Sequence, residues 1–436
     1  MTIRSKDQLD FPGCQGRRVE ARFDGGAVTS DAGVLLLRQA DRKVGLLAHV
    51  ARRLKDPRDP KRVTHSQASM LRQRVYGIAL GNEDLNDHDT LRNDLALQTA
   101  VDRVEPLASS PTLCRLDNRA ERETAWAMHE VLVEQFIASF QEPPKELILD
   151  FDATDDPVHG NQVGKFFHGF YDEYCFLPLY VFCEERLLVA YLRPASRGAA
   201  HHAGAILKLL LRKLRAVWPE VRIVFRGDSH FCTPPILGFC DRNAVDYIVG
   251  LAKNKRLNRL AEATSAKAAQ RFAKTGRKAR LFTGFRYATR NWNRKRRVIA
   301  RIEHDAEGTN PRYVVTSLRG HGRDLYEQVY CARGEMENRI KEQLQLFSDR
   351  TSCHEWWPNQ FRLLLSSLAY TLLETIRRLS LQGTELARAQ VATIRLKLLK
   401  IGAVIVRNTR RVRFLLSSAY PGQDLFRLVA ARLAPS

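Results

Sequence analysis

Three acidic residues stand out in this chain because of the runs that contain them: Asp152 in ELILDFDATDDPVHG, Asp228 in VRIVFRGDSHFC and Glu337 in YCARGEMENRIKEQ. Two of them lie at or just past the end of an apolar, strand-like run, and the third lies in a segment of helical character. Carboxylate oxygens are the ligands that hard divalent cations prefer. In a basic protein, a compact acidic cluster is the expected way to hold such ions against nucleic-acid phosphates.

Each of these acidic residues, taken alone, also has an ordinary structural explanation. Asp152 and Asp228 fit strand-end turns, and Asp228 also fits a helix N-cap. Glu337 fits a solvated helix face with i,i+4 ion pairs. Two strand-end aspartates in one α/β unit favour a shared site, because ligands bind at the carboxyl ends of strands in such sheets. Asp150 precedes Asp152 by two residues and falls on the same strand face.

The segment around Glu337 carries a polar stripe. Tyr330, Arg333, Glu337 and Lys341 are three or four residues apart, so one helix would place them on one face. Arg333 and Lys341 would flank Glu337 and favour its ionised form. The same two cations are candidates for contacts with DNA phosphates.

Composition points to a nucleic-acid partner. The chain has 436 residues and a formal net charge of +22, with 44% hydrophobic residues. Its length predicts two or three domains, and its apolar content allows a real core. A dispersed positive excess favours nucleic acid, because phosphate contacts release counterions. An anionic membrane surface is the alternative partner.

Two function classes are disfavoured. The eight cysteines form no CxxC pair, which argues against a zinc ribbon or finger and predicts reduced thiols in a cytoplasmic protein. The longest apolar stretch, 361–376, is interrupted by Arg362 and Glu374, so it predicts a core helix and no membrane association.

Hydrophobic periodicity divides the chain into regions. Helical spacing predicts a helical N-terminal region with helices in 29–54, 64–81 and 118–140. Strand-like and helical runs then alternate and predict a mixed α/β sheet. The boundaries that follow are 1–140 for the helical region, 141–254 and 320–380 for two parts of an α/β core, 255–319 for a basic β-rich insertion, and 381–436 for a basic C-terminal region made of a helix followed by a strand.

The order of these motifs resembles bacterial insertion-sequence transposases of the DDE class, most closely the insertion-sequence thirteen-eighty group. The resemblance runs over almost the whole chain. Its most specific segments are 150–172, 222–232 and 330–343, with support from 77–94 and 393–403.

The resemblance implies an RNase H-like catalytic core interrupted by the insertion. It implies cut-and-paste movement of a DNA element with terminal inverted repeats, using two Mg²⁺ ions that Mn²⁺ would replace. The family's acidic residues match Asp152, Asp228 and Glu337, and its Tyr-x-x-Arg-x-x-x-Glu signature matches Tyr330 and Arg333 as well. The wider class often has a Lys seven residues after the Glu, where this chain has Leu344; Lys341 is the nearest candidate. A homodimer acting on element ends and target DNA in the bacterial cytoplasm, associated with the nucleoid, is the implied working form.

The basic insertion supplies further candidates for DNA contact. Its cluster is expected to touch the phosphate backbone, against the alternative of a solvated charge run; the members are Arg290, Arg294, Lys295, Arg296 and Arg297. Trp292 is a candidate for stacking on a flipped base, as in some relatives, or for simple packing. His159, Gln162 and His168 follow Asp152 and either orient DNA or serve the structure.

Two other functions remain open from the residues. The chain could bind DNA without cutting it, as a transposase relic or a repressor of transposition. It could also be a structure-specific nuclease of RNase H-like fold. A protein that only binds DNA would not cleave it in the presence of Mg²⁺, whereas a transposase would. A structure-specific nuclease would cleave DNA without terminal repeats, whereas a transposase depends on them.

Overall fold

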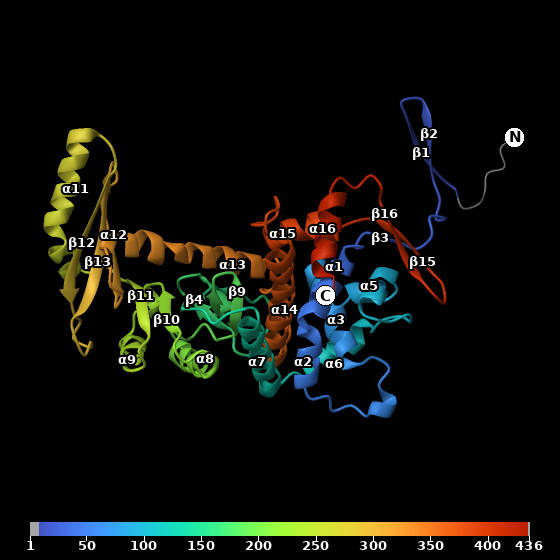
Figure 1. Ribbon diagram of the computed structural model, residues 1–436, viewed down its shortest axis with the longest axis horizontal. Coiled ribbons are helices and arrows are strands. Elements are labelled where there is room, and N and C mark those ends of the chain that lie inside the picture. Colours follow the sequence, from blue (N-terminus) through green and yellow to red (C-terminus); the bar gives the residue numbers. More distant parts are fainter. Residues whose placement is uncertain (1–7, 435–436) are drawn as a thin grey trace. The chain divides into compact units, whose positions relative to one another are not determined.

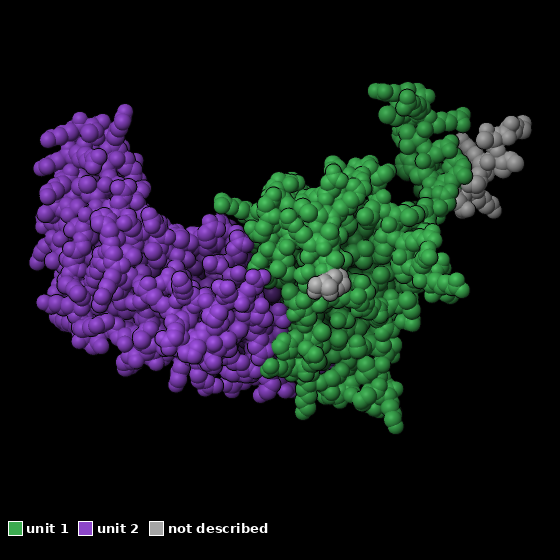
Figure 2. All heavy atoms as spheres, viewed as in Figure 1, with its two compact units in different colours: residues 1–116, 372–436 green, residues 117–371 purple. Residues whose placement is uncertain are grey.

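The structure, a computed structural model, describes residues 8–434. Residues 1–7 and 435–436, at the ends of the first and last predicted regions, lie outside the described residues. The chain divides into two compact units, unit 1 with residues 1–116 and 372–436, and unit 2 with residues 117–371 (Figure 2). The three acidic residues that the sequence singles out all belong to unit 2.

Unit 2 is built on an 8-stranded sheet with the strand order β12-β13-β14-β11-β10-β4-β8-β9 (Figure 1). The neighbours β4, β10 and β11 are parallel, and the other neighbouring pairs are antiparallel. The predicted mixed α/β sheet is therefore confirmed. The strands are β4 (Glu146–Ala153), β8 (Leu179–Cys183), β9 (Arg186–Tyr191), β10 (Arg222–Gly227), β11 (Asp246–Leu251), β12 (Ala279–Tyr287), β13 (Arg296–Asp305) and β14 (Gly308–Thr316).

Helices and short turns connect these strands. The helical elements of unit 2 are α7 (Arg122–Ala138), α8 (Ala203–Val217), η2 (Ser229–Phe231), α9 (Pro234–Arg242), α10 (Lys255–Leu260), α11 (Glu262–Thr275), α12 (Gly322–Asp324), η3 (Leu325–Tyr330), η4 (Cys331–Arg333), α13 (Gly334–Leu344) and α14 (Trp356–Ser380), which continues into unit 1. A second small sheet has the order β5-β7-β6. Its strands are β5 (Asp156–Pro157), β6 (Phe166–His168) and β7 (Glu173–Phe176).

The two faces of the large sheet have different neighbours. Alternation along β4 puts Leu147, Leu149 and Phe151 into the main core, where α7, α8 and α9 pack. The other face of β4 carries Ile148, Asp150 and Asp152, and Ile148 packs with the η3 segment. The predicted acidic residues of β4 therefore face the segment that leads to Glu337.

A buried ion pair joins the central strands on that second face. Register places Asp150 of β4 beside Arg226 of β10, and the Arg226 guanidinium donates to both carboxylate oxygens of Asp150. Arg226 Nη1 also donates to the carbonyl of Val329 at 2.5 Å. One side chain thus ties two strands to the end of η3.

The region 255–319 differs from the expected β-rich insertion. Its first part folds as the helices α10 and α11, and α11 packs against β12 and β13. Its three strands continue the large sheet next to β11 and form no separate sheet. Antiparallel pairing of β14 with β11 explains this, because the open edge of β11 accepts the returning chain.

Unit 1 contains most of the predicted N-terminal helices. The range 29–54 is broken into two helices at Gly45, whose φ of 66° ends the first one. The helical elements are α1 (Val34–Val44), α2 (Leu46–Arg53), η1 (Pro60–Arg62), α3 (Gln67–Leu80), α4 (Asp87–Leu91), α5 (Leu95–Ala100), α6 (Ser110–Asn118, which crosses into unit 2), α15 (Val391–Ile394), η5 (Arg395–Leu399) and α16 (Gln423–Leu433).

Strands at both ends of the chain also belong to unit 1. The hairpin of β1 (Leu9–Cys14) and β2 (Arg17–Ala21) was not expected in a helical region. A 3-stranded sheet has the order β16-β15-β3, from β3 (Val28–Thr29), β15 (Ala403–Arg407) and β16 (Val412–Leu416). The predicted C-terminal strand is therefore a hairpin of two strands. No helix in residues 8–434 combines the length and apolar character that crossing a membrane requires.

Candidate active site

Asp152 and Asp228 lie at the same edge of the large sheet. Asp152 is the second-last residue of β4, and Asp228 directly follows β10. These strands are parallel, with Gly227 beside Phe151. Asp152 follows Phe151, and Asp228 follows Gly227. Both carboxylates therefore lie at the carboxyl ends of adjacent strands.

Arg333 links the helical acidic residue to the sheet. Its guanidinium donates to Asp152 Oδ2 at 2.7 Å and to Glu337 Oε1 at 2.9 Å. Arg333 and Glu337 are four residues apart along one helical stretch, whereas Arg333 and Asp152 are separated by 181 residues. A single cation thus brings two of the three predicted acidic residues together.

The electrostatics couple all three carboxylates. Burial raises the pKa of Asp152 to about 6, and the Arg333 guanidinium opposes that rise. The negative charges of Asp228 and, more weakly, Glu337 raise the pKa of Asp152 further. The exposed fractions differ, because the Asp152 side chain is 13% exposed and that of Glu337 is 53% exposed. Asp152 is the enclosed member of the group, and Glu337 lies at its open side.

The η3 segment packs closely on the sheet at Gly250, which has no side chain. A β-carbon added to Gly250 would lie 2.7 Å from Tyr330 Oη and 2.8 Å from the backbone nitrogen of Ser229. Gly250 therefore makes room for both the Tyr330 side chain and the turn that follows Asp228. The π-helical turns of η3 and the tighter turns of η4 precede α13, so Tyr330 and Arg333 do not lie on one regular helix with Glu337 as the spacing predicted.

Asp228 is held in its turn by His230. The Asp228 carboxylate accepts from the His230 backbone nitrogen at 2.9 Å and lies 2.8 Å from His230 Nδ1. His230 is mostly exposed. Sequence reasoning passed over His230, although the spacing Asp-Ser-His at a strand end was a usable signal for such a turn.

The other predicted residues near Asp152 lie in or beside the small sheet. Gln162 donates to the carbonyl of Thr351 at 3.4 Å. The ring of His168 lies 4.9 Å from that of Tyr171. His159 is exposed and lowers the pKa of Glu173, whose overall shift is nevertheless upward because burial outweighs it. Lys341 lies one turn beyond Glu337 on α13 and is exposed.

The predicted DNA-contact residues of 290–297 separate into exposed and enclosed side chains. Trp292 is 9% exposed and packs edge-to-face on Tyr287. Arg296 is 2% exposed and bonds Asp241. Arg297 donates to backbone carbonyls of 318 and 320, and Arg294 pairs with Asp241 while remaining half exposed. Arg290 and Lys295 are exposed.

Carboxylates are suitable ligands for a hard cation, but here Arg333 supplies the positive charge between Asp152 and Glu337. Across residues 8–434, no group of three or more His, Cys, Asp or Glu side chains is arranged to hold a metal ion. Carboxylate oxygens match the ligand preference of hard divalent cations, but the described side chains as arranged here do not form such a site. Arg333 bonds one oxygen of each of the two carboxylates, Oδ2 of Asp152 and Oε1 of Glu337.

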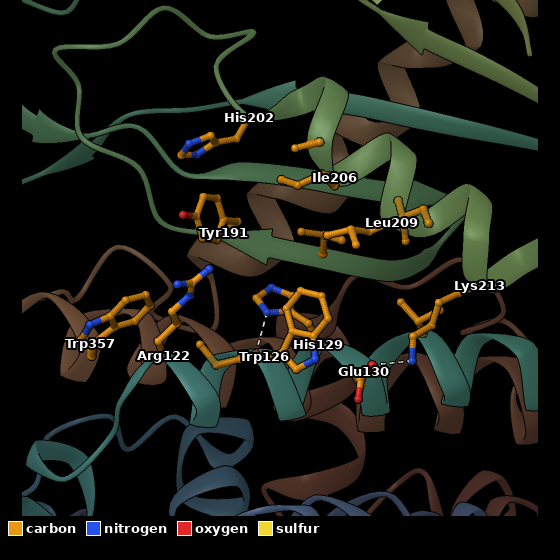
Figure 3. Close-up of a pocket in the computed structure, with 15 residues that line it drawn as sticks. Arg122, Trp126, His129, Glu130, Tyr191, His202, Ile206, Leu209, Lys213 and Trp357 are labelled. Carbon is orange, nitrogen blue, oxygen red and sulfur yellow. Dashed lines mark hydrogen bonds and ion pairs between the residues drawn. The ribbon is translucent and has the colours of Figure 1, made fainter. Parts of the chain in front are cut away.

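A separate cavity of about 320 Å³ lies between α7 and α8 in unit 2 (Figure 3). Its walls are mainly apolar, with Trp126 and Tyr191 among them and an ion pair of Lys213 with Glu130 at 2.6 Å. None of the predicted site residues lines this cavity. The acidic site is therefore an open edge of the sheet, distinct from this hollow.

We expect Gly250→Ala to destabilise unit 2 by about 1–3 kcal/mol, because the added methyl group meets backbone atoms that cannot move cheaply. Gly284→Ala in β12 is the matched control, since its nearest atom would be 3.6 Å away. Urea unfolding at one pH measures both. Equal stability of the two variants would contradict the close approach at Gly250.

We expect the buried carboxyl of Asp156 to make the stability of the protein depend on pH. Burial raises the pKa of its carboxyl to about 8, although Thr351 donates a hydrogen bond to it. The protonated Asp156 carboxyl contributes to the free energy of unfolding, and this contribution is fully present below the ordinary carboxyl pKa. It is lost as the pH rises through about 8, because the folded state keeps a proton on Asp156 that the unfolded state releases. Between pH 5 and 8 the free energy of unfolding should fall more steeply for the wild type than for Asp156→Asn, by up to ~1.4 kcal/mol per pH unit. Parallel curves from urea unfolding would refute this.

No curated protein matches the chain in a sequence comparison. A family model does match, the one described as transposase DDE domain group 1, and it covers residues 11–436. That range includes Asp152, Asp228, Glu337 and nearly every described residue. Such a match implies DNA as the partner and transposase activity in general. By this match over almost its whole length, the chain belongs to the family of DDE transposases of domain group 1.

Proposed function

We propose that the chain cleaves and joins DNA strands at the terminal inverted repeats of an insertion sequence, with Asp152, Asp228 and Glu337 as its metal-binding acidic residues. The observation that carries this proposal is the Arg333 bridge between Asp152 and Glu337, with Asp228 electrostatically coupled to Asp152. Asp152 and Asp228 lie at one edge of the sheet, and Arg333 joins Glu337 to Asp152. The family match supplies the transposase context.

The strand arrangement supports an RNase H-like core as the finer form of the α/β fold. The run β9-β8-β4-β10-β11 begins with antiparallel neighbours and continues with parallel ones. Asp152 lies near the end of β4, and Asp228 directly follows β10. The strands β12 to β14 extend this sheet, so we infer that the inserted segment and the core form one continuous scaffold.

The chain's own residues have definable roles in such a reaction. Bound to the three carboxylates, two Mg²⁺ ions would activate a water or 3′-hydroxyl and stabilise the leaving oxygen of the phosphodiester. Tyr330 packs beside Asp228 and keeps the helical segment on the sheet. Arg333, once released from one carboxylate, is placed to donate to a DNA phosphate. Lys341, exposed one turn beyond Glu337, is placed for a second such contact.

DNA would approach the protein where these charged side chains are exposed. Glu337 and Lys341 are exposed on α13, and Arg290 and Lys295 are exposed beside β13. The enclosed side chains of Trp292 and Arg296 have little surface to offer to DNA, so we assign them to packing and to the ion pair with Asp241. The exposed half of Arg294 remains part of the proposed contact.

The triad is tested by single substitutions. Asp152→Ala, Asp228→Ala and Glu337→Ala should each lower Mg²⁺-dependent cleavage and joining of the element ends on the order of 100-fold or more, because each removes a metal ligand. DNA affinity should change little. Strand-transfer gels and binding titrations measure the two properties.

Glu335→Ala is the matched control for this test, because Glu335 is an exposed carboxylate on the same helix. It should keep wild-type cleavage. If the three triad variants cut as well as the wild type, the site assignment fails. If the wild type binds its ends but never cuts in Mg²⁺ or Mn²⁺, the transposase activity itself fails.

The phosphate contacts are tested by salt dependence. Arg290→Ala combined with Lys295→Ala should weaken binding to any DNA sequence and reduce the slope of log affinity against log salt by roughly one per lost contact. The pair Arg290→Lys and Lys295→Arg keeps both charges and should keep the slope. An unchanged slope for the alanine pair would exclude these residues from the interface.

A further inference from the structure

The hairpin β1–β2 (the arm) has one apolar face and one polar face. Register pairs Leu9 with Ala21, Asp10 with Glu20, and Phe11 with Val19. Directly paired residues point to the same side of a hairpin, and successive residues alternate. Leu9, Phe11, Val19 and Ala21 therefore share one face, opposite to that of Asp10 and Glu20.

Nothing in the described part of the chain covers the arm's apolar face. All residues from 9 to 28 are exposed, and Phe11 is 54% exposed. The arm forms a 2-stranded sheet that pairs with no other described strand (Figure 1). An isolated hairpin is marginally stable at best in water. A formed arm with an open apolar face is therefore suited to packing against another surface.

The charge of the arm disfavours DNA as that surface. Residues 8–24 hold three arginines and three acidic residues, so the segment is neutral within a chain of net charge +22. A phosphate-binding segment gains affinity from positive charge. Two copies of so basic a chain repel each other, and a neutral apolar arm is a surface on which they can meet with little repulsion.

Unit 1 carries a second exposed apolar surface, which is also one face of a β-sheet. Register places Val28, Val404 and Leu415 side by side across β3, β15 and β16, and Val406 follows on the same face. Val28, Val406 and Leu415 are 62%, 46% and 55% exposed. The opposite side of β15, at Ala403 and Ile405, is buried. We call the four exposed or partly exposed residues the open face.

We propose that two copies of the chain exchange arms, with the apolar face of each arm packed on the open face of the other copy. Two β-surfaces that pack face to face lie ~10 Å apart, with apolar side chains interdigitated. Reciprocal contact closes a two-fold dimer. A stable interface needs roughly 20–30 residues a side, and the arm with its connection supplies residues 9–27 before the open face is added.

The proposal is tested on the full-length protein without DNA or metal, by sedimentation over a range of concentrations. The double variant Phe11→Ser, Val19→Ser should raise the dimer dissociation constant at least tenfold. Its thermal unfolding as a monomer should match the wild type, since the arm packs on nothing else described. Asp10→Ser with Glu20→Ser, on the polar face, is the matched control and should dimerise normally.

A mixing experiment identifies the partner surface. Val28→Ser with Leu415→Ser should also raise the dimer dissociation constant at least tenfold. When this open-face variant is mixed with the arm variant, one intact arm meets one intact open face, so heterodimers should reappear at intermediate affinity. Neither variant alone should dimerise as tightly as the mixture.

Three outcomes would overturn the proposal. The wild type could remain monomeric at all concentrations, with the arm folded on its own chain. The arm variant could dimerise as well as the wild type, which would place the interface elsewhere. Protease protection of the arm that appears only on adding DNA would make DNA the occupant.

Discussion

The buried ion pair between Asp150 and Arg226 is the interaction on which the arrangement of the site depends. It lies between two parallel central strands, and Arg226 also bonds the carbonyl of Val329. Removing either charge would leave the other unpaired in the interior, which is among the costliest changes in a core. Burial raises the pKa of Asp150, and the hydrogen bonds from Arg226 counter that rise. Through this pair, the strand that carries Asp152 is connected to the segment that leads to Glu337.

Charge balance then governs the site itself. Carboxylates that converge at a sheet edge repel each other, and Arg333 offsets that repulsion by bonding two of them. The same guanidinium stabilises the two carboxylates beside each other, and in our proposal metal ions would supply positive charge there as well. In our proposal, the movement of Arg333 to a DNA phosphate is linked to the binding of cations. The cations replace the positive charge that Arg333 removes from the carboxylates.

Much of the fold was predictable because its strands and helices carry clear periodicity. The strand-like runs at β4 and β10, and the helices α3, α7 and α13, lie where the pattern placed them. The break at Gly45 required a left-handed backbone whose position the apolar pattern does not mark. The arm was missed because Pro12 and Gly13 interrupt its alternation. The helices in 255–275 were missed because a dense run of Lys and Arg was interpreted only as charge.

The sequence by itself determined the identity of the candidate site: two aspartates at strand ends, a glutamate on a helix, and the Tyr and Arg before it. Residue type and local periodicity carry that information over short distances. Only the tertiary structure decided which side chains meet. Parallel register brings Asp228 beside Asp152, the missing side chain of Gly250 admits Tyr330, and packing encloses Trp292 and Arg296 while leaving Arg290 exposed. These outcomes depend on contacts between residues far apart in the chain, and local sequence patterns do not predict such contacts.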